Sequence, residues 1–201
     1  MGWVVLGHVF GFRLEFSYIE NTDDVYDLFK DKVLALVYGG YFAVDTFFWI
    51  GGLLIAYLFL KEIDAKGNVN WVLVYAHRLW RIVPLYMFVL FWMWAFLPLL
   101  GDGPRWYEAD SAFNDCREWW PANLFFFNNF VPDWKASDCM SWSWYLANDM
   151  QFFIITPPIL YLYHRFSRVI GWVANCLLIC ISIGMSAYIA DYHDYNAVII
   201  A

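Results

Sequence analysis

Residues 169–190 read VIGWVANCLLICISIGMSAYIA and contain no acidic or basic side chain. A transmembrane α-helix needs about 20 consecutive, mostly apolar residues to cross the ~30 Å hydrocarbon core of a bilayer. This stretch is long and apolar enough to do so. It therefore predicts a transmembrane helix and, with it, a membrane protein.

The composition of the whole chain agrees with a membrane protein. Of its 201 residues, 62% are hydrophobic, 23% aromatic and only 15% charged, whereas soluble domains average about 45–50% apolar and about 25% charged residues. This balance excludes a soluble globule, a disordered chain, a collagen and a coiled coil. Because the apolar stretches are continuous and do not alternate over about ten residues, the sequence predicts an all-α, polytopic transmembrane helical bundle.

Three more stretches can cross the membrane because each contains at most one ionisable side chain: Val33–Leu60, Ile82–Gly101 and Met140–Tyr163. Trp3–Phe12 is also apolar but too short to span, and the chain turns apolar again from Asn196. We therefore expect about four full spans and a partial first span, all within one transmembrane domain over residues 1–201. We also expect further helices of a larger protein to complete this bundle.

The charges of the loops predict how the spans are oriented. Short cytoplasmic loops are enriched in Lys and Arg. Lys61–Arg81 and His164–Arg168 both carry more basic than acidic residues, whereas the loops on the opposite side are rich in acids. We therefore expect Lys61–Arg81 and His164–Arg168 to be cytoplasmic, in an integral, multi-pass protein of the plasma membrane or an internal membrane.

Residues 101–142 form a long aromatic loop, which this orientation places in a lumen or outside the cell. Cys116 and Cys139 both lie in this loop, and an oxidising compartment favours a disulfide between them. The alternatives are two free thiols or a partner elsewhere in the protein. Trp119–Pro132 is uncharged but too short to span, so we expect an interfacial or re-entrant segment, with a plain aromatic belt as the alternative.

Three ionisable side chains lie within the predicted membrane helices, namely His8, Asp45 and Asp149. At 1.5 Å per residue, each lies roughly 7–12 Å below the lumenal surface. Such groups are usually functional, and an imidazole beside a carboxylate can remove a proton from a hydroxyl group. The alternatives are a histidine that only bonds neighbouring helices, and acids that cap broken helices, bind an ion or pair with basic residues of absent helices. Asp149 with Pro157 and Pro158 also fits the kinked helix of a transporter.

A basic pair precedes the span that begins at Ile82. Arg78 and Arg81 are three residues apart, so on a helix they share one face. Guanidinium groups match phosphate oxygens, and the N-terminus of a helix adds positive potential, so the pair predicts a polyphosphate site. The alternative is a pair of basic residues that binds lipid headgroups at the cytoplasmic surface.

Five blocks of the sequence, taken in chain order, are Trp3–His8, Val44–Phe48, His77–Tyr86, Trp119–Phe130 and Cys139–Phe152. Together they resemble the membrane acyltransferase 3 family, and its nose-resistant-to-fluoxetine-like branch in particular. The blocks are spread over nearly the whole chain. The last block, CMSWSWYLANDMQF, is specific.

The resemblance implies a multi-pass enzyme that moves an acyl group, often acetyl, from acyl-CoA to a hydroxyl group of a lipid, sugar or other acceptor. His8 matches the family's proposed catalytic histidine. Arg78 and Arg81 match its arginine pair that is thought to engage the donor. Asp149 stands where many bacterial members have Glu. In the combined hypothesis, acyl-CoA phosphates bind the arginines, and His8, oriented by Asp45 or Asp149, deprotonates the acceptor.

We expect Asn123, Trp144 and Asn148 to line the cavity that holds these groups. The expected partners are acyl-CoA as co-substrate, a hydroxyl-bearing acceptor, membrane lipids and the remaining helices of the full-length protein. Neither a metal ion nor a nucleic acid is expected. Two other functions stay open: a multi-pass transporter or lipid-handling protein that uses the same acids for coupling, and a catalytically silent fragment.

Overall fold

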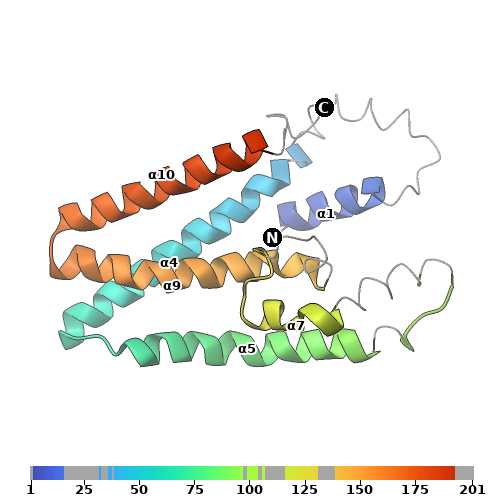
Figure 1. The fold of residues 1–201 in the computed structure, drawn as a ribbon, viewed down its shortest axis with the longest axis horizontal. Helices are drawn as coiled ribbons and strands as arrows, with labels where there is room; N and C mark the ends of the chain where they lie inside the picture. The colour runs from blue at the N-terminus through green and yellow to red at the C-terminus, as the bar shows by residue number, and fades with distance from the viewer. Residues whose placement is uncertain are drawn as a thin grey trace. The chain divides into compact units, whose positions relative to one another are not determined.

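The computed structural model describes residues 2–15, 32, 36–37, 39–96, 99–103, 106, 116–130 and 139–192 (Figure 1). Every regular element in these ranges is a helix, which confirms the all-α fold class. The elements are α1 (Gly2–Glu15), η1 (Gly39–Tyr41), α4 (Phe42–Lys66), α5 (Trp71–Phe96), α7 (Cys116–Leu124), η3 (Ser141–Ser143), α9 (Trp144–Arg165) and α10 (Arg168–Tyr192).

Among the described residues, three helices are long and apolar enough to cross a membrane: α4, α5 and α10. They correspond to three of the predicted spans. The fourth, Met140–Tyr163, corresponds to α9, which is helical but less apolar, because Asn148, Asp149 and Gln151 follow one another closely near its start. A membrane-crossing position for α9 stays a prediction.

The chain divides into two compact units, Met1–Leu54 and Ile55–Ala201, and α4 continues from the first into the second. In the first unit, Trp3 Nε1 donates a hydrogen bond to the Leu36 carbonyl at 2.6 Å. Gly40 lies close beneath the same residue, because a Cβ there would stand 3.2 Å from the Trp3 carbonyl oxygen. The helix expected over Trp3–Phe12 is confirmed within α1.

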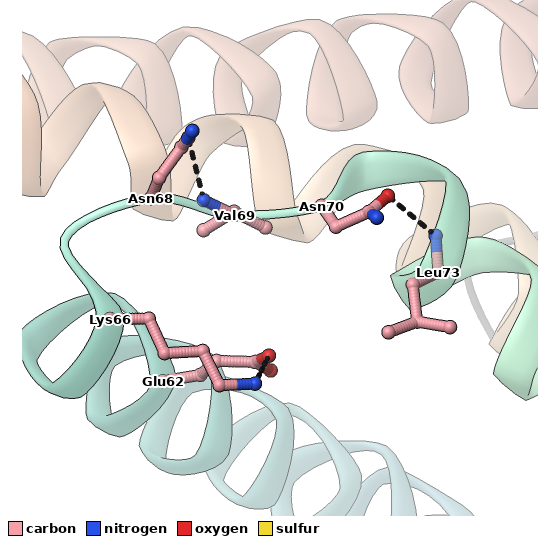
Figure 2. A network of polar contacts seen from close by, with 6 residues as sticks. All are labelled: Glu62, Lys66, Asn68, Val69, Asn70 and Leu73. Carbon is pink, nitrogen blue, oxygen red and sulfur yellow. Dashed lines mark hydrogen bonds and ion pairs between the residues drawn. The ribbon is translucent and has the colours of Figure 1, made fainter.

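The connection between α4 and α5 is a short turn over residues 67–70, so the loop expected over Lys61–Arg81 is wrong in its bounds. Gly67 ends α4 with a positive φ of 68°, and its N–H donates to the Ile63 carbonyl at 2.8 Å. This is the usual left-handed glycine cap of a helix C-terminus. Asn70 then caps α5, because its Oδ1 accepts the N–H of Leu73 at 3.2 Å (Figure 2). The charged residues expected in a loop therefore lie on two helices.

An apolar cluster fixes this turn against α9. Val69, in the turn, is only 5% exposed and is buried with Phe59 and Ile63 of α4. Leu160 and Tyr161 of α9 pack against the same cluster. Close by, Nε2 of His164 on α9 lies 2.8 Å from Oδ1 of Asp64 on α4. The two segments predicted to be cytoplasmic therefore meet at one end of the second unit.

Helices α9 and α10 form an antiparallel hairpin (Figure 1). The link between them is only Phe166 and Ser167, and Ser167 caps α10 by accepting the Val169 N–H at 3.2 Å. The two helices approach closely at Gly171, where a Cβ would stand 2.6 Å from the Tyr163 Cβ. A glycine is needed there because any side chain would overlap the neighbouring helix.

A second apolar cluster joins α5 to the aromatic segment. The predicted disulfide between Cys116 and Cys139 is confirmed, and both cysteines are almost fully buried. They pack with Leu90 of α5, Phe126 of the turn after α7, and Met150 of α9. The disulfide therefore holds the segment against the second half of α5. The other two cysteines, Cys176 and Cys180 of α10, are free and exposed.

Candidate functional site

A cavity of about 620 Å³ opens among α4, α5 and α9 within the second unit. We refer to it as the basic cavity. Most of its lining is apolar, and its ionisable side chains are Glu62 of α4, His77, Arg78 and Arg81 of α5, and Asp149 of α9. Three of these five were identified from the sequence as site residues. The fold brings them into one cavity because α5 and α9 run antiparallel.

The register of these two helices is visible in their contacts. Trp71 of α5 packs edge-on against Tyr161, and Tyr75 packs edge-on against Phe153. Partners on α9 thus move toward its N-terminus as α5 advances. The next inward-facing residue of α5 is Arg78, which reaches Asp149.

Arg78 and Asp149 form an ion pair between Nη2 and Oδ2. The side chains are only 20% and 21% exposed, so the pair is shielded from most of the solvent. The guanidinium carbon also lies 4.2 Å from the ring centroid of Phe153, which is a cation–π distance. Asp149 and Phe153 are four residues apart and share one face of α9, so they hold Arg78 between them.

The observed start of α5 changes the expected position of the two arginines relative to the N-terminus of their helix. Arg78 lies about 10 Å along α5 from its first residue, Trp71, at 1.5 Å per residue. The field of a helix terminus acts mainly within the first turn. The expectation that a helix N-terminus adds positive potential beside Arg78 and Arg81 is therefore wrong. Their predicted common face is confirmed, since both line the basic cavity.

The prolines of α9 are accommodated by a neighbour on α5. Pro158 has no N–H, so the carbonyl of Ile154, four residues earlier, loses its usual helical partner. Tyr75 replaces that partner, because its hydroxyl donates to the Ile154 carbonyl at 3.0 Å. Helix α9 continues as a single element through Pro157 and Pro158. The carbonyl freed by Pro158 is thus satisfied by Tyr75, and the kinked helix of the transporter alternative stays a prediction.

A group of neutral side chains, here called the amide network, lies on the other side of the ion pair. At its centre is Asn123 of α7, which is fully buried. Its Oδ1 accepts hydrogen bonds from the Tyr86 hydroxyl at 3.0 Å and the Ser143 hydroxyl at 3.1 Å. Asn128 donates to the Ser143 hydroxyl at 3.1 Å. These bonds join α5, α7 and the start of α9.

The outer part of the amide network holds a strained turn. Phe126 has a positive φ of 58°, a conformation that residues with a side chain rarely adopt. Gln151 of α9 donates to its carbonyl at 2.8 Å and to Asn129 Oδ1 at 2.7 Å. Asn129 in turn donates to Asn148 Oδ1 at 2.8 Å. The turn is therefore fixed by side chains that flank Asp149 on the same helix.

The structure places the expected lining residues Asn123, Trp144 and Asn148 outside the lining of the basic cavity. Asn123 and Asn148 belong to the amide network, and Trp144 is 45% exposed at the start of α9. His77 and Glu62 also line the cavity, although neither was predicted from the sequence as a site residue. His77 precedes Arg81 by four residues, and that helical spacing was the available signal.

His8 and Asp45 belong to the first unit and are both exposed. His8 lies in α1, where its Nδ1 is 2.8 Å from the Val4 carbonyl oxygen. Asp45 lies in the first turn of α4. The basic cavity is formed entirely by residues of the second unit. The catalytic grouping of His8 with Asp45 or Asp149 stays a prediction.

Known proteins provide an independent comparison. The chain is 27% identical over 208 residues to nose resistant to fluoxetine protein 6 of Caenorhabditis elegans. This match covers 97% of this chain and 25% of that protein. It is 27% identical to regulator of hypoxia-inducible factor 1 of the same organism, over 83% of this chain and 33% of that protein. It is 32% identical to the O-acetyltransferase OatA of Staphylococcus aureus, over 64% of this chain and 21% of that protein.

The chain thus spans a third or less of the length of these relatives. No solved structure matches it. A family model described as an acyltransferase domain matches residues 1–200, which is almost the whole chain. The resemblance of the five sequence blocks is confirmed by this match, and the chain belongs to the acyltransferase 3 family.

Proposed function

We propose that the chain is part of a multi-pass membrane acyltransferase that moves an acyl group, often acetyl, from acyl-CoA to a hydroxyl group of a lipid, sugar or other acceptor. The observation that carries the proposal is the basic cavity. In this cavity the chain, which belongs to the acyltransferase 3 family, brings Arg78, Arg81 and Asp149 together. The name O-acetyltransferase of one relative supports the same reaction class.

The basic cavity suits the phosphate end of a CoA ester. Arginine side chains bind phosphate oxygens through charge-assisted hydrogen bonds. The cavity lies toward the end of the second unit where the α4–α5 turn meets the α9–α10 turn, which is the end we propose to be cytoplasmic. Acyl-CoA would therefore enter from the cytoplasm, with its flexible arm directed along the bundle.

Acyl transfer needs a base for the acceptor hydroxyl. His8 is the candidate because an imidazole can accept the proton of a hydroxyl group, and a neighbouring carboxylate stabilises the resulting imidazolium. The hydroxyl oxygen then attacks the thioester carbonyl, the carbon–sulfur bond breaks, and the proton reaches the departing thiolate to give free CoA. Asp45 and Asp149 are the candidate carboxylates for this role.

The proposal is tested by acyl-CoA turnover of the full-length protein in liposomes, with free thiol as the readout. We expect thiol release that needs an acceptor and that falls at least a hundredfold in His8→Ala, because general-base catalysis contributes about 10²–10⁴-fold. His164→Gln is the matched control, since His164 contacts Asp64 outside the cavity lining.

Two outcomes would contradict the proposal. Normal turnover in His8→Ala would remove the histidine from the chemistry. Movement of a substrate across the membrane without consumption of acyl-CoA would support the transporter alternative instead.

A further inference from the structure

We infer that an anionic phospholipid binds at the start of α10, with its headgroup on Arg165 and Arg168 and one acyl chain in an apolar groove along the same helix. The two arginines and the groove belong to the second unit, and none of these residues lines the basic cavity. The inference therefore goes beyond the proposed function and does not depend on acyl transfer.

The groove lies on an exposed face of α10 and has a volume of about 360 Å³. Its lining residues recur every three or four positions, so they share one side of the helix. All are apolar and exposed, namely Val169, Trp172, Val173, Cys176, Leu177 and Cys180. Gly171, which packs against Tyr163 of α9, lies on the opposite side. Among the described residues, only those of α10 line the groove, so an apolar ligand can reach it.

The groove is about as long as one leaflet of a bilayer is deep. From Val169 to Cys180 the helix rises roughly 16 Å at 1.5 Å per residue, and half of the ~30 Å hydrocarbon core is about 15 Å. Helix α10 is long and apolar enough to cross that core. An acyl chain that reaches the middle of the bilayer therefore matches the groove from end to end.

The charge beside the groove is positive and has no counter-charge. Arg165 ends α9 and Arg168 begins α10, so the two arginines flank the short link between the helices (Figure 1). Both are exposed, and neither has an ion-pair partner among the described residues. Asp64 of α4, at the same end of the second unit, lies 2.8 Å from His164 Nε2 instead. A negatively charged headgroup supplies the counter-charge that the described chain does not.

The arginines and the groove are adjacent, which favours a lipid over a soluble anion. Arg168 directly precedes Val169, the first residue of the groove, and lies one helical turn from Trp172. Guanidinium groups bind phosphate oxygens through charge-assisted hydrogen bonds. A phospholipid carries a phosphate and an acyl chain in one molecule, whereas a soluble phosphate ester has nothing to fill the groove. This end is the one we propose to be cytoplasmic, and the cytoplasmic leaflet contains anionic lipids.

The test measures the first bound lipid on the full-length protein by native mass spectrometry. Phosphatidylglycerol is compared with phosphatidylcholine of the same acyl chains, so that only the headgroup differs. Each arginine near an anionic lipid contributes about fivefold in affinity. We therefore expect Arg165→Gln with Arg168→Gln to weaken phosphatidylglycerol binding about twentyfold and to leave phosphatidylcholine binding unchanged. Lys61→Gln is the matched control, because it removes an exposed cation of α4, and it should bind both lipids like wild type.

A second pair of variants tests the groove. Cys176→Trp with Cys180→Trp fills it but keeps both arginines, and should weaken binding of both lipids roughly tenfold, which corresponds to about two CH₂ groups that are no longer buried. Cys176→Ser with Cys180→Ser is the matched control, because it removes the same thiols without adding bulk. It should bind both lipids like wild type. Thermal unfolding of each variant in detergent checks that it folds.

Three outcomes would overturn the inference. Equal binding of the two lipids by wild type, or unchanged binding in the folded arginine variant, would remove the role of the headgroup. Unchanged binding in a folded tryptophan variant would mean that another helix of the full-length protein, and not an acyl chain, covers the groove. Competition by glycerophosphoglycerol, the headgroup without acyl chains, at the same concentration as the lipid would mean that the arginines bind a soluble phosphate ester.

Discussion

The basic cavity and the amide network lie on either side of the same ion pair, yet the first contains ionisable side chains and the second neutral ones. The cavity contains ionisable side chains from three helices. Two of these side chains, His77 and Arg81, are exposed and have no ion-pair partner among the described residues. The amide network contains neutral groups whose centre, Asn123, is fully buried and hydrogen-bonded. A disulfide closes the segment that carries it.

This difference has a physical reason. A charge is costly to bury unless it is paired, so unpaired charges remain where water or a ligand can reach them. Neutral amides can be buried at little cost once their hydrogen bonds are formed. The cavity is therefore suited to binding, and the amide network to holding the backbone around the start of α9. Substitutions in the two regions should separate stability from binding.

The largest expected effect is on the side of the amide network, from removal of the disulfide. Cys116→Ser with Cys139→Ser should lower the stability of the full-length protein by about 2–4 kcal/mol, because the unfolded chain gains conformational freedom. Thermal unfolding in detergent measures the loss as a lower Tm. Cys176→Ser with Cys180→Ser is the control, since both thiols are free and exposed. Equal Tm values for the two double variants would contradict a stabilising role of the disulfide.

The ion pair, which separates the two regions, should give the next effect. Asp149→Asn leaves the Arg78 charge unpaired in a site where it is only 20% exposed. We expect a loss of about 1–3 kcal/mol, below the value for a fully buried pair. Adding Arg78→Gln should recover part of this loss, because the uncompensated charge is gone. A double-mutant cycle measures the coupling, and additive losses would show that the two side chains do not interact.

Two tyrosine hydroxyls of α5 compare a hydrogen bond beside the prolines of α9 with one inside the amide network. Tyr75→Phe should cost about 1–2 kcal/mol, because it leaves the Ile154 carbonyl without a donor beside Pro158. Tyr86→Phe should cost less, about 0.5–1 kcal/mol, since Asn123 Oδ1 keeps the hydrogen bond from Ser143. Chemical unfolding of both variants measures the order. A larger loss in Tyr86→Phe would mean that Ser143 alone does not satisfy Asn123 Oδ1.

Much of the helical architecture follows from the sequence, because hydropathy over a long window directly reflects helix length in a membrane. The predicted span Val169–Ala190 lies within α10, and the cysteine pair was found from its place in one loop that was predicted to be lumenal. The start of α5 was missed because charged residues extend the helix beyond its apolar part. Gly67 and Asn70 were the local signals for that turn.

The partners within the site were not predictable in the same way. The sequence put Arg78 on one predicted face with Arg81, but its pairing with Asp149 depends on the register between α5 and α9. That register is set by contacts such as Trp71 with Tyr161, which no local pattern specifies. The same holds for Gln151, whose partner is the carbonyl of Phe126 in a turn with positive φ.

The smallest expected effect on stability comes from a substitution that changes the charge of the basic cavity. Lys66→Ala removes an exposed i, i+4 ion pair with Glu62 and should cost only about 0.3–0.5 kcal/mol. It also leaves the Glu62 carboxylate uncompensated in the basic cavity, so the affinity of the full-length protein for CoA, the proposed phosphate-bearing ligand, should fall two- to threefold, by roughly 0.5 kcal/mol of added repulsion. Lys61→Ala is the control, because Lys61 lies over the Tyr57 ring at 5.8 Å on the same helix. An equal loss of affinity in both variants would mean that general surface charge, and not the pairing of Glu62, tunes the cavity.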